Sequence, residues 1–302
     1  MTKTWVIVVG AMICCTLWGS AFPCIKIGYR MMEIAAADTA SQILYAGYRF
    51  TLAGVLTIVL GSILQRKILL PKRSAIGKIG LLSLLQTVLQ YLFFYIGLAH
   101  TTGVKASIIE AVSTFVAILV AGYLFHQETV TSRKMLGCLI GFAGVVLVNV
   151  AGSGMDFHFS PAGDGCILLS TVAYAFSSVC MKRFSQKEDP VMLSGYQFIL
   201  GGIVMIACGA AMGGHLKAFT ASAAALLIYM AMISAVAYSL WGMLLKYNPV
   251  SKVTVFGFMN PVIGVILSAL LLNETESLGV SSVLALGLVC VGIYIVNAKA
   301  KE

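Results

Sequence analysis

The chain has 302 residues, of which 60% are hydrophobic and 10% are charged, and its mean hydropathy is +0.97. Soluble globular domains carry about 45–50% apolar and about 25% charged residues, so this composition excludes a soluble protein and indicates one whose solvent is the lipid bilayer. The formal net charge of +9 does not indicate a nucleic-acid partner, because Lys and Arg sit in short connectors between apolar runs, where they set membrane orientation.

Ten apolar segments are long enough to cross the ~30 Å hydrocarbon core of a bilayer as helices. The first, from Trp5, lacks the basic start and small-residue cleavage site of a signal peptide, so we expect a span rather than a leader. We predict an all-α membrane protein with ten transmembrane helices. The predicted spans are residues 5–28, 43–64, 76–98, 104–125, 134–151, 164–182, 192–213, 223–245, 252–272 and 279–297.

The distribution of Lys and Arg predicts the orientation of these spans. With the N-terminus inside, fifteen of these residues fall on the inner side and three, Arg30, Lys105 and Lys217, on the outer side. Cytoplasmic loops carry the excess of positive charge. We therefore expect both termini to face the cytoplasm, in the plasma membrane of a bacterium.

The sequence contains an internal repeat. Each half holds five spans, so the second half enters the membrane from the opposite face, which predicts an inverted-topology repeat suited to alternating access. Duplication that serves folding alone is the alternative. The predicted repeats are residues 1–151 and 164–302, joined by the Gly-rich segment 152–163. The matched motifs are Gly47–Phe50 with Gly195–Phe198, Trp18 with Tyr174, and Gly144-x4-Asn149 with Gly292-x4-Asn297.

Several short motifs recur in an order that resembles the EamA type of the drug/metabolite transporter superfamily, over nearly the whole chain. They are Trp18-Gly19-Ser20, Arg49-Phe50, Glu128 followed by Gly137 and Gly144, and Asn260-Pro261 with Glu274. The resemblance implies a bundle in which the first four helices of each half surround a cavity and the fifth and tenth are peripheral. It also implies export or exchange of amino acids, other metabolites or drugs, coupled to protons or a counter-substrate rather than ATP.

The chain departs from this pattern at two places. Ser113-Thr114 stands where such repeats commonly carry a proline, which puts a kink of the fourth helix in doubt. Glu110 is not a standard family position, so the resemblance gives it no role. Glu128 and Glu274 occupy equivalent positions at membrane edges, where we expect helix capping and contacts between the repeats rather than substrate binding.

Arg49 and Glu110 are the ionisable residues that lie clearly inside predicted spans. Such residues cost about 2.5–3.5 kcal/mol to insert and are therefore functional candidates. Both lie about six residues, or ~9 Å, below the outer surface, which predicts an ion pair. We hypothesise that Glu110 takes up a proton or meets a cationic solute group, with Arg49 as its partner or as an anchor for a solute carboxylate. A purely structural pair, or Arg49 capping backbone carbonyls, is the alternative.

Other polar and aromatic residues are weaker site candidates. We expect some of the aromatic residues at matched repeat positions to line a cavity, although rings in spans mostly face lipid or neighbouring helices. Pro261 frees a backbone carbonyl, so Asn260 is included. Lys26 either reaches the site or snorkels to the outer interface. The aromatic candidates are Trp18, Tyr48, Tyr95, Tyr196 and Trp241.

The sequence as a whole predicts a secondary-active transporter of small metabolites, an exporter or exchanger of amino acids, amines or related solutes, with proton coupling as one option. A channel or a membrane-embedded enzyme is the alternative. The chain has no G-x-x-x-x-G-K-[ST] loop for ATP and no C-x-x-C pair among its eight cysteines, so we expect neither a metal nor a cofactor. We expect a small-molecule solute and the lipid bilayer as partners, and a monomer or homodimer. The sequence does not name the solute.

Overall fold

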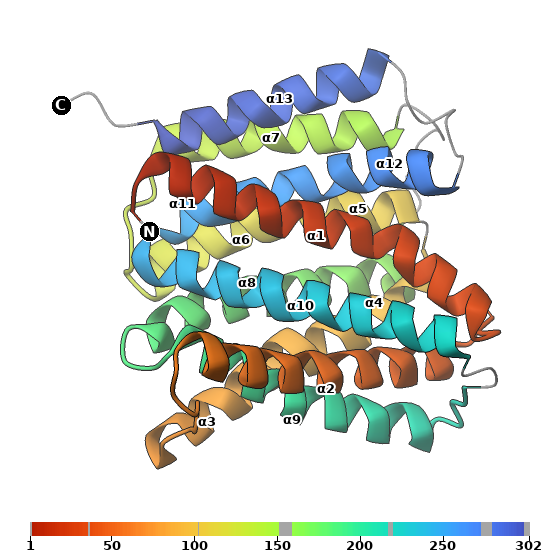
Figure 1. Cartoon of the computed structure of the whole chain (residues 1–302). Coiled ribbons are helices and arrows are strands. Elements are labelled where there is room, and N and C mark those ends of the chain that lie inside the picture. The colour runs from red at the N-terminus through yellow and green to blue at the C-terminus, as the bar shows by residue number, and fades with distance from the viewer. Residues whose placement is uncertain are drawn as a thin grey trace.

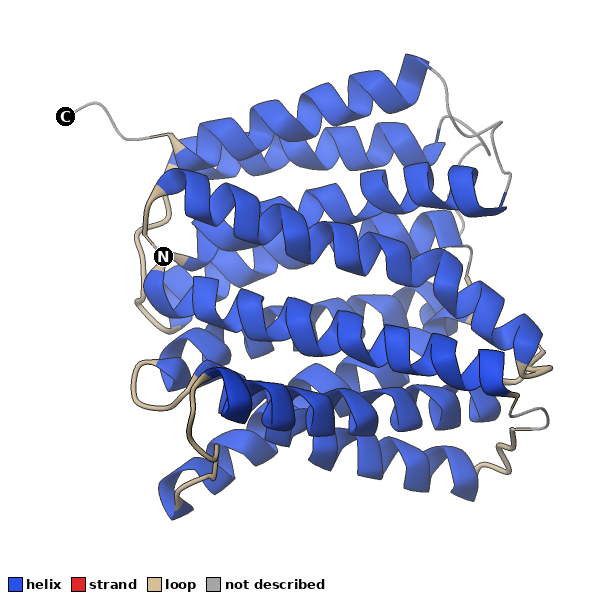
Figure 2. Ribbon diagram, viewed as in Figure 1, coloured by secondary structure: helices blue, strands red, loops and turns tan. Residues whose placement is uncertain are grey.

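The computed structural model describes residues 2–35, 37–101, 103–150, 159–216, 220–272 and 280–298. Every regular element in these ranges is a helix (Figure 2). Most of the predicted linker, together with Lys217, Glu274, Lys299 and Lys301, lies outside the described residues. Six described helical segments are long and apolar enough to cross a membrane: Thr4–Met31, Thr39–Leu64, Arg73–Leu98, Pro161–Ser185, Pro190–Ala211 and Ala221–Tyr247. Shorter apolar helices include Ile108–Leu124 and Val283–Asn297.

The helices follow the predicted spans to within a few residues. The N-terminal half contains α1 (Thr4–Met31), α2 (Thr39–Leu64), a run of α3 (Arg73–Leu82), η1 (Ser83–Leu89) and α4 (Gln90–Leu98), a run of α5 (Gly103–Ala111), α6 (Ser113–Leu119) and η2 (Val120–Leu124), and α7 (Ser132–Val150). The C-terminal half contains η3 (Pro161–Gly165), α8 (Cys166–Ser185), α9 (Pro190–Ala211), α10 (Ala221–Tyr247), a run of α11 (Val250–Thr254), η4 (Val255–Phe258) and α12 (Met259–Leu272), and α13 (Val280–Asn297).

Short polar side chains cap the beginnings of several helices. Asp38 Oδ1 accepts from Ser41 N at 3.0 Å at the start of α2. Asp189 Oδ1 accepts from the amides of Val191 and Met192 at 2.8 and 3.0 Å, directly before α9. Each carboxylate satisfies amides that have no partner within their own helix. The apolar segments therefore begin as helices at polar residues, where the chain enters the apolar core.

Helices α2 and α9 lie side by side through glycines of the matched motifs (Figure 1). A Cβ on Gly54 would lie 2.5 Å from the carbonyl oxygen of Gly195, and one on Gly202 would lie 2.5 Å from Thr51 N. Position numbers fall along α9 as they rise along α2, so the two helices are antiparallel. Glycine allows this close backbone approach because it has no side chain.

Helices α7 and α13 repeat this arrangement at one edge of the bundle (Figure 1). A Cβ on Gly137 would lie 2.9 Å from the carbonyl oxygen of Gly292, and one on Gly144 would lie 2.7 Å from that of Ala285. Gly144 and Gly292 are matched in the sequence repeat, as are Gly47 and Gly195. The contacts are reciprocal and do not join matched glycines to each other. Gly144 meets Ala285, whereas Gly292 meets Gly137. Gly47 likewise meets Gly202, whereas Gly195 meets Gly54.

We expect Gly54→Val to lower the thermal unfolding midpoint in detergent by several degrees. The added side chain cannot fit 2.5 Å from a backbone oxygen, overpacking of this kind costs about 1–3 kcal/mol, and each kcal/mol lowers the midpoint by about 2–4 °C in a chain of this size. Gly77→Val is the matched control, because a Cβ on Gly77 has nothing within 4 Å. Equal midpoints for the two variants would contradict the close contact of α2 and α9.

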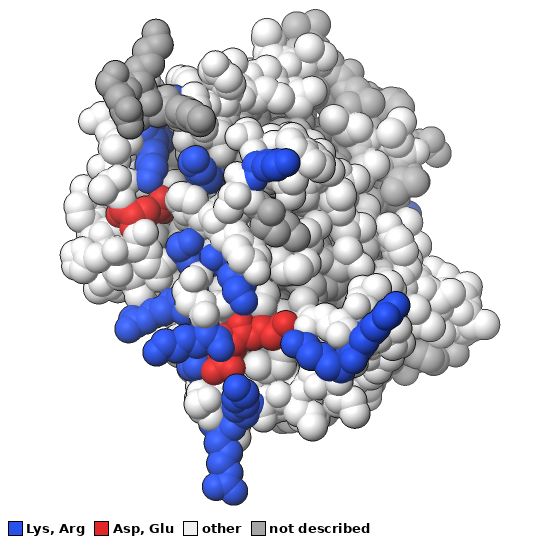
Figure 3. Space-filling model, turned by 60° about the vertical axis from the view of Figure 1, so that its left-hand side comes forward, with Lys and Arg blue, Asp and Glu red and all other residues white. Residues whose placement is uncertain are grey.

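Basic residues gather at the end of the bundle where α1 begins and α13 ends. Figure 3 brings this end forward and shows Lys and Arg spread over it, with few acidic residues. Two of the lysines form ion pairs: Lys78 Nζ lies 2.5 Å from Glu188 Oε1, and Lys134 Nζ lies 2.8 Å from Glu128 Oε2. The exposed cations of this end include Lys3, Arg66, Lys67, Lys72, Arg73, Arg183 and Lys187.

Candidate functional site

A cavity of about 150 Å³ lies between the two halves of the chain. This is about ten times the ~10–15 Å³ that one water molecule requires. Among the described residues, α7 and α13 contribute nothing to its wall, in line with the peripheral place that the family resemblance implies. The second helix of the C-terminal half, α9, contributes no described residue either, although the resemblance implies that it borders the cavity. The lining residues are Trp18, Ala21, Ile25, Arg49, Gln90, Tyr91, Phe94, Tyr95, Glu110, Ala111, Ser113, Thr114, Ser170, Thr171, Tyr174, Tyr238, Thr254, Gly257, Asn260 and Pro261.

Five of the site candidates from the sequence come together in this wall: Trp18, Arg49, Tyr95, Glu110 and Asn260. They come from five different helices, α1, α2, α4, α5 and α12. Residues separated by more than 200 positions in the chain therefore face one space.

The other four candidates lie outside the cavity wall. Tyr48 is 44% exposed, Tyr196 packs partly buried against the apolar core, and Lys26 is exposed on α1. Helical geometry explains these positions: Tyr48 and Lys26 each directly adjoin a lining residue, and neighbours in a helix point about 100° apart. Trp241 is buried behind Trp18, with ring centroids 5.0 Å apart in an edge-to-face arrangement, and supports the wall from outside.

Arg49 is directed toward α10 rather than toward Glu110. Its Nε and Nη2 atoms donate to Ser234 Oγ at 3.3 and 3.0 Å, and its guanidinium carbon lies 4.9 Å from the centroid of the Phe50 ring. The ion pair that we predicted from equal depth is not formed in the described part of the chain. Depth alone does not fix the rotation of a helix, and α2 turns Arg49 toward the fully buried Ser234.

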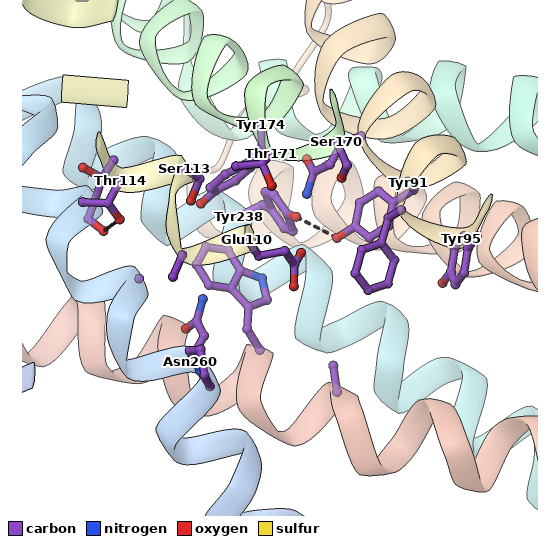
Figure 4. Close-up of a pocket in the computed structure, with 18 of the residues that line it drawn as sticks. Tyr91, Tyr95, Glu110, Ser113, Thr114, Ser170, Thr171, Tyr174, Tyr238 and Asn260 are labelled. Atoms are coloured by element: carbon purple, nitrogen blue, oxygen red, sulfur yellow. Dashed lines mark hydrogen bonds between the residues drawn. The ribbon is translucent and has the colours of Figure 1, made fainter. Parts of the chain in front are cut away.

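Glu110 points into the cavity and has no hydrogen bond or ion pair with any residue that the structure describes (Figure 4). Its neighbours in the wall include Asn260 and the rings of Tyr91 and Tyr238. A carboxylate removed from water without a partner is costly. A proton, or a cationic group of a bound solute, would remove that cost.

Two interrupted helices meet in the wall of the cavity. The fourth span is interrupted for one residue between α5 and α6, at Val112, in a stretch that has no proline. In the ninth span, the 3₁₀ turn η4 precedes Pro261, which cannot donate a hydrogen bond to the carbonyl of Gly257. Thr114 Oγ1 donates to the carbonyl oxygen of Thr254 at 3.1 Å and joins the two breaks. Interrupted membrane helices expose backbone groups where they line a cavity.

An aromatic cluster joins the halves beside the cavity. The hydroxyl groups of Tyr91 and Tyr238 lie 2.8 Å apart (Figure 4). Phe50 and Phe198, which are matched in the repeat, stack with centroids 5.3 Å apart and ring planes 13° from parallel. The site candidates omitted Tyr91, Tyr238 and Tyr174. The match of Tyr174 with Trp18 was a signal that could have identified it.

Three buried polar atoms of the wall lack a hydrogen-bond partner: Trp18 Nε1, Gln90 Oε1 and Asn260 Oδ1. Buried polar groups are nearly always hydrogen-bonded, so these atoms can bind water or a solute. Together with Glu110 and Arg49 they provide donors, acceptors and both signs of charge. No group of three or more His, Cys, Asp or Glu side chains suitable for a metal ion occurs among the described residues.

The described residues thus form a helical multi-pass membrane protein with a polar and aromatic cavity between the two halves of the chain. The model of the EamA-like transporter family matches residues 5–150 and again residues 161–298. The chain belongs to the EamA-like transporter family and is a membrane transporter.

Similar proteins span nearly the full length of the chain. An uncharacterized transporter of Archaeoglobus fulgidus is 28% identical over 98% of this chain and 99% of its own length. The uncharacterized inner membrane transporter YedA of Escherichia coli is 28% identical over 94% of this chain and 90% of its own length. A protein of known crystal structure shares the fold with a TM-score of 0.80 at 16% identity, covering 98% of this chain and 97% of its own.

Proposed function

We propose that the protein is a secondary-active transporter that exports or exchanges amino acids, amines or related small solutes by alternating access. The observation that carries the proposal is the cavity between the halves, which places Glu110 and Arg49 in one wall without pairing them. A carrier needs a solute site that both halves build, because movement of one half against the other then changes the access to that site.

The proposal includes ten membrane-spanning helices in two inverted repeats, residues 1–151 and 164–302. Two features support this architecture. The family model matches the chain twice, once in each half. The matched glycines of α2 and α9 make reciprocal contacts, Gly54 with Gly195 and Gly47 with Gly202. The basic end of the bundle supports cytoplasmic termini, because cytoplasmic loops carry the excess of Lys and Arg. A bacterial plasma membrane is the proposed location.

The chemistry of the wall supports a solute that carries a cationic group. Glu110 offers an unpaired carboxylate, and the neighbouring rings of Trp18 and Tyr91 attract cations through their faces. Arg49 and the Trp18 indole N–H provide donors for an acidic or polar group on the same solute. Because a proton can replace the cation on Glu110, the same residue provides a route to proton coupling.

Counterflow in proteoliposomes tests the proposal. Vesicles loaded with an unlabelled amino acid or amine are expected to accumulate the labelled compound, with saturation and only when the internal compound is one that the protein carries. A panel screened first by thermal stabilisation selects the compounds, since a ligand of the folded state raises its stability. Conductance without saturation would favour a channel, and chemical conversion of the compound would favour an enzyme.

A further inference from the structure

The connection between α2 and α3 forms a basic elbow, which we define as residues 64–76. Four cations lie within eight positions, Arg66, Lys67, Lys72 and Arg73, and all are exposed. None of the four forms an ion pair with a described residue. Lys78 and Lys134, at the same end of the bundle, do have carboxylate partners. The positive charge of the elbow is therefore not neutralised by the described protein.

The backbone of the elbow turns apolar side chains outward beside these charges. Leu69 is anchored in the core at 3% exposure, and its amide donates to Ser62 Oγ at 3.1 Å. Its two neighbours, Ile68 and Leu70, are 78% and 69% exposed. Ile76, on the first turns of α3, is 61% exposed. Exposed apolar groups next to unneutralised cations match a surface that is anionic at the headgroups and apolar just beneath them.

We propose that the basic elbow binds anionic phospholipids, with its cations on the headgroup phosphates and its exposed apolar side chains at the acyl boundary. A free phosphate ion would use the cations but not Ile68 and Leu70. The assignment of this lipid site to the cytoplasmic leaflet rests on the orientation given under the proposed function. The preference for anionic lipids does not depend on that orientation. Clusters of four or more Lys and Arg beside a membrane helix bind anionic lipids in this way.

Native mass spectrometry of the purified protein in detergent tests the elbow. The protein is titrated with phosphatidylglycerol or with phosphatidylcholine of the same acyl chains. We expect the wild type to prefer phosphatidylglycerol, and the R66Q/K67Q/K72Q/R73Q variant to bind it about tenfold or more weakly. The matched control, K3Q/R183Q/K187Q/K246Q, removes four cations from the same end of the bundle, where Lys246 lies in the last turn of α10. This control is expected to keep the preference.

Three results would overturn the proposal: an unchanged lipid preference in the elbow variant, an equal loss in the control, or displacement of the lipid by inorganic phosphate at a matching concentration. If the fourfold variant does not fold, R66Q/K67Q and K72Q/R73Q are tested separately, each expected to lose part of the preference. Replacing Ile68 and Leu70 by Ser is expected to weaken the binding of both phosphatidylglycerol and phosphatidylcholine. Counterflow is measured separately, so failure of the lipid site and failure of the transport proposal are distinguishable.

Discussion

Replacing Glu110 by Gln is expected to reduce counterflow of a cationic solute by about 10- to 100-fold and to remove its dependence on pH. Gln keeps the shape of the side chain but can neither carry a charge nor take up a proton. Hydrogen bonds to a charged group contribute about 1.5–3 kcal/mol, and 1.4 kcal/mol is a factor of ten in binding. The measurement is the initial rate of exchange in proteoliposomes from mildly acidic to mildly alkaline pH.

The direction of the pH effect follows from the chemistry. A proton on Glu110 competes with a cationic solute, so wild-type exchange is expected to fall as the pH is lowered and to approach the rate of the variant. Glu33→Gln is the matched control, because Glu33 is exposed and does not line the cavity. Normal exchange in the Glu110→Gln variant would show that Glu110 does not bind the solute. Slow exchange that still depends on pH would contradict only the proposed uptake of a proton by Glu110.

The helical fold was predictable because each predicted span combines high hydropathy with a length that fits the bilayer. Helix boundaries were also readable where polar residues such as Asp38 and Asp189 cap a helix. The break at Val112 could not be predicted from the sequence, because no proline or glycine marks it. Close to the break, Thr114 donates to the carbonyl of Thr254, a contact between residues 140 positions apart that no local pattern indicates.

The candidate site was partly predictable for a related reason. Charge inside a span identified Arg49 and Glu110, and both line the cavity. Their partners were not predictable, because the rotation of α2 decides whether Arg49 meets Glu110 or Ser234. The same rotation moves Tyr48 outward when Arg49 faces inward. An alignment of the two repeats identifies equivalent residues. It does not predict which face of each helix is turned toward the interior of the bundle.

Glu128 was expected to cap a helix and to join the halves, and this prediction is confirmed. Its Oε1 accepts from Ser251 N at 2.9 Å and its Oε2 from Ser251 Oγ at 2.5 Å, at the start of α11. Lys134 Nζ donates to the same carboxylate at 2.8 Å. The side chain of Glu128 is 5% exposed, so solvent screens these interactions little. The hydrogen bonds of Glu128 thus connect the start of the ninth span to the segment after the fourth span, at the basic end of the bundle.

Replacing Glu128 by Ala is expected to speed hydrogen exchange of the α11 amides by about tenfold or more and to change the exchange rate of solute. The variant loses charge-assisted hydrogen bonds worth about 1.5–3 kcal/mol each, and that loss is larger than the 1.4 kcal/mol that shifts a two-state equilibrium tenfold. Hydrogen exchange with mass spectrometry measures the first effect and counterflow the second.

Glu188→Ala is the matched control for Glu128. Glu188 is also a nearly buried glutamate at the basic end, and its ion pair with Lys78 also joins the two halves. It has no hydrogen bond or ion pair with the described residues of α11, so its loss is expected to leave the α11 amides protected. If both variants loosen α11 equally, the effect is a general weakening of this end of the bundle. If neither does, the contact between Glu128 and Ser251 does not hold the ninth span, and the movement of the two halves must be limited by the packing around the cavity.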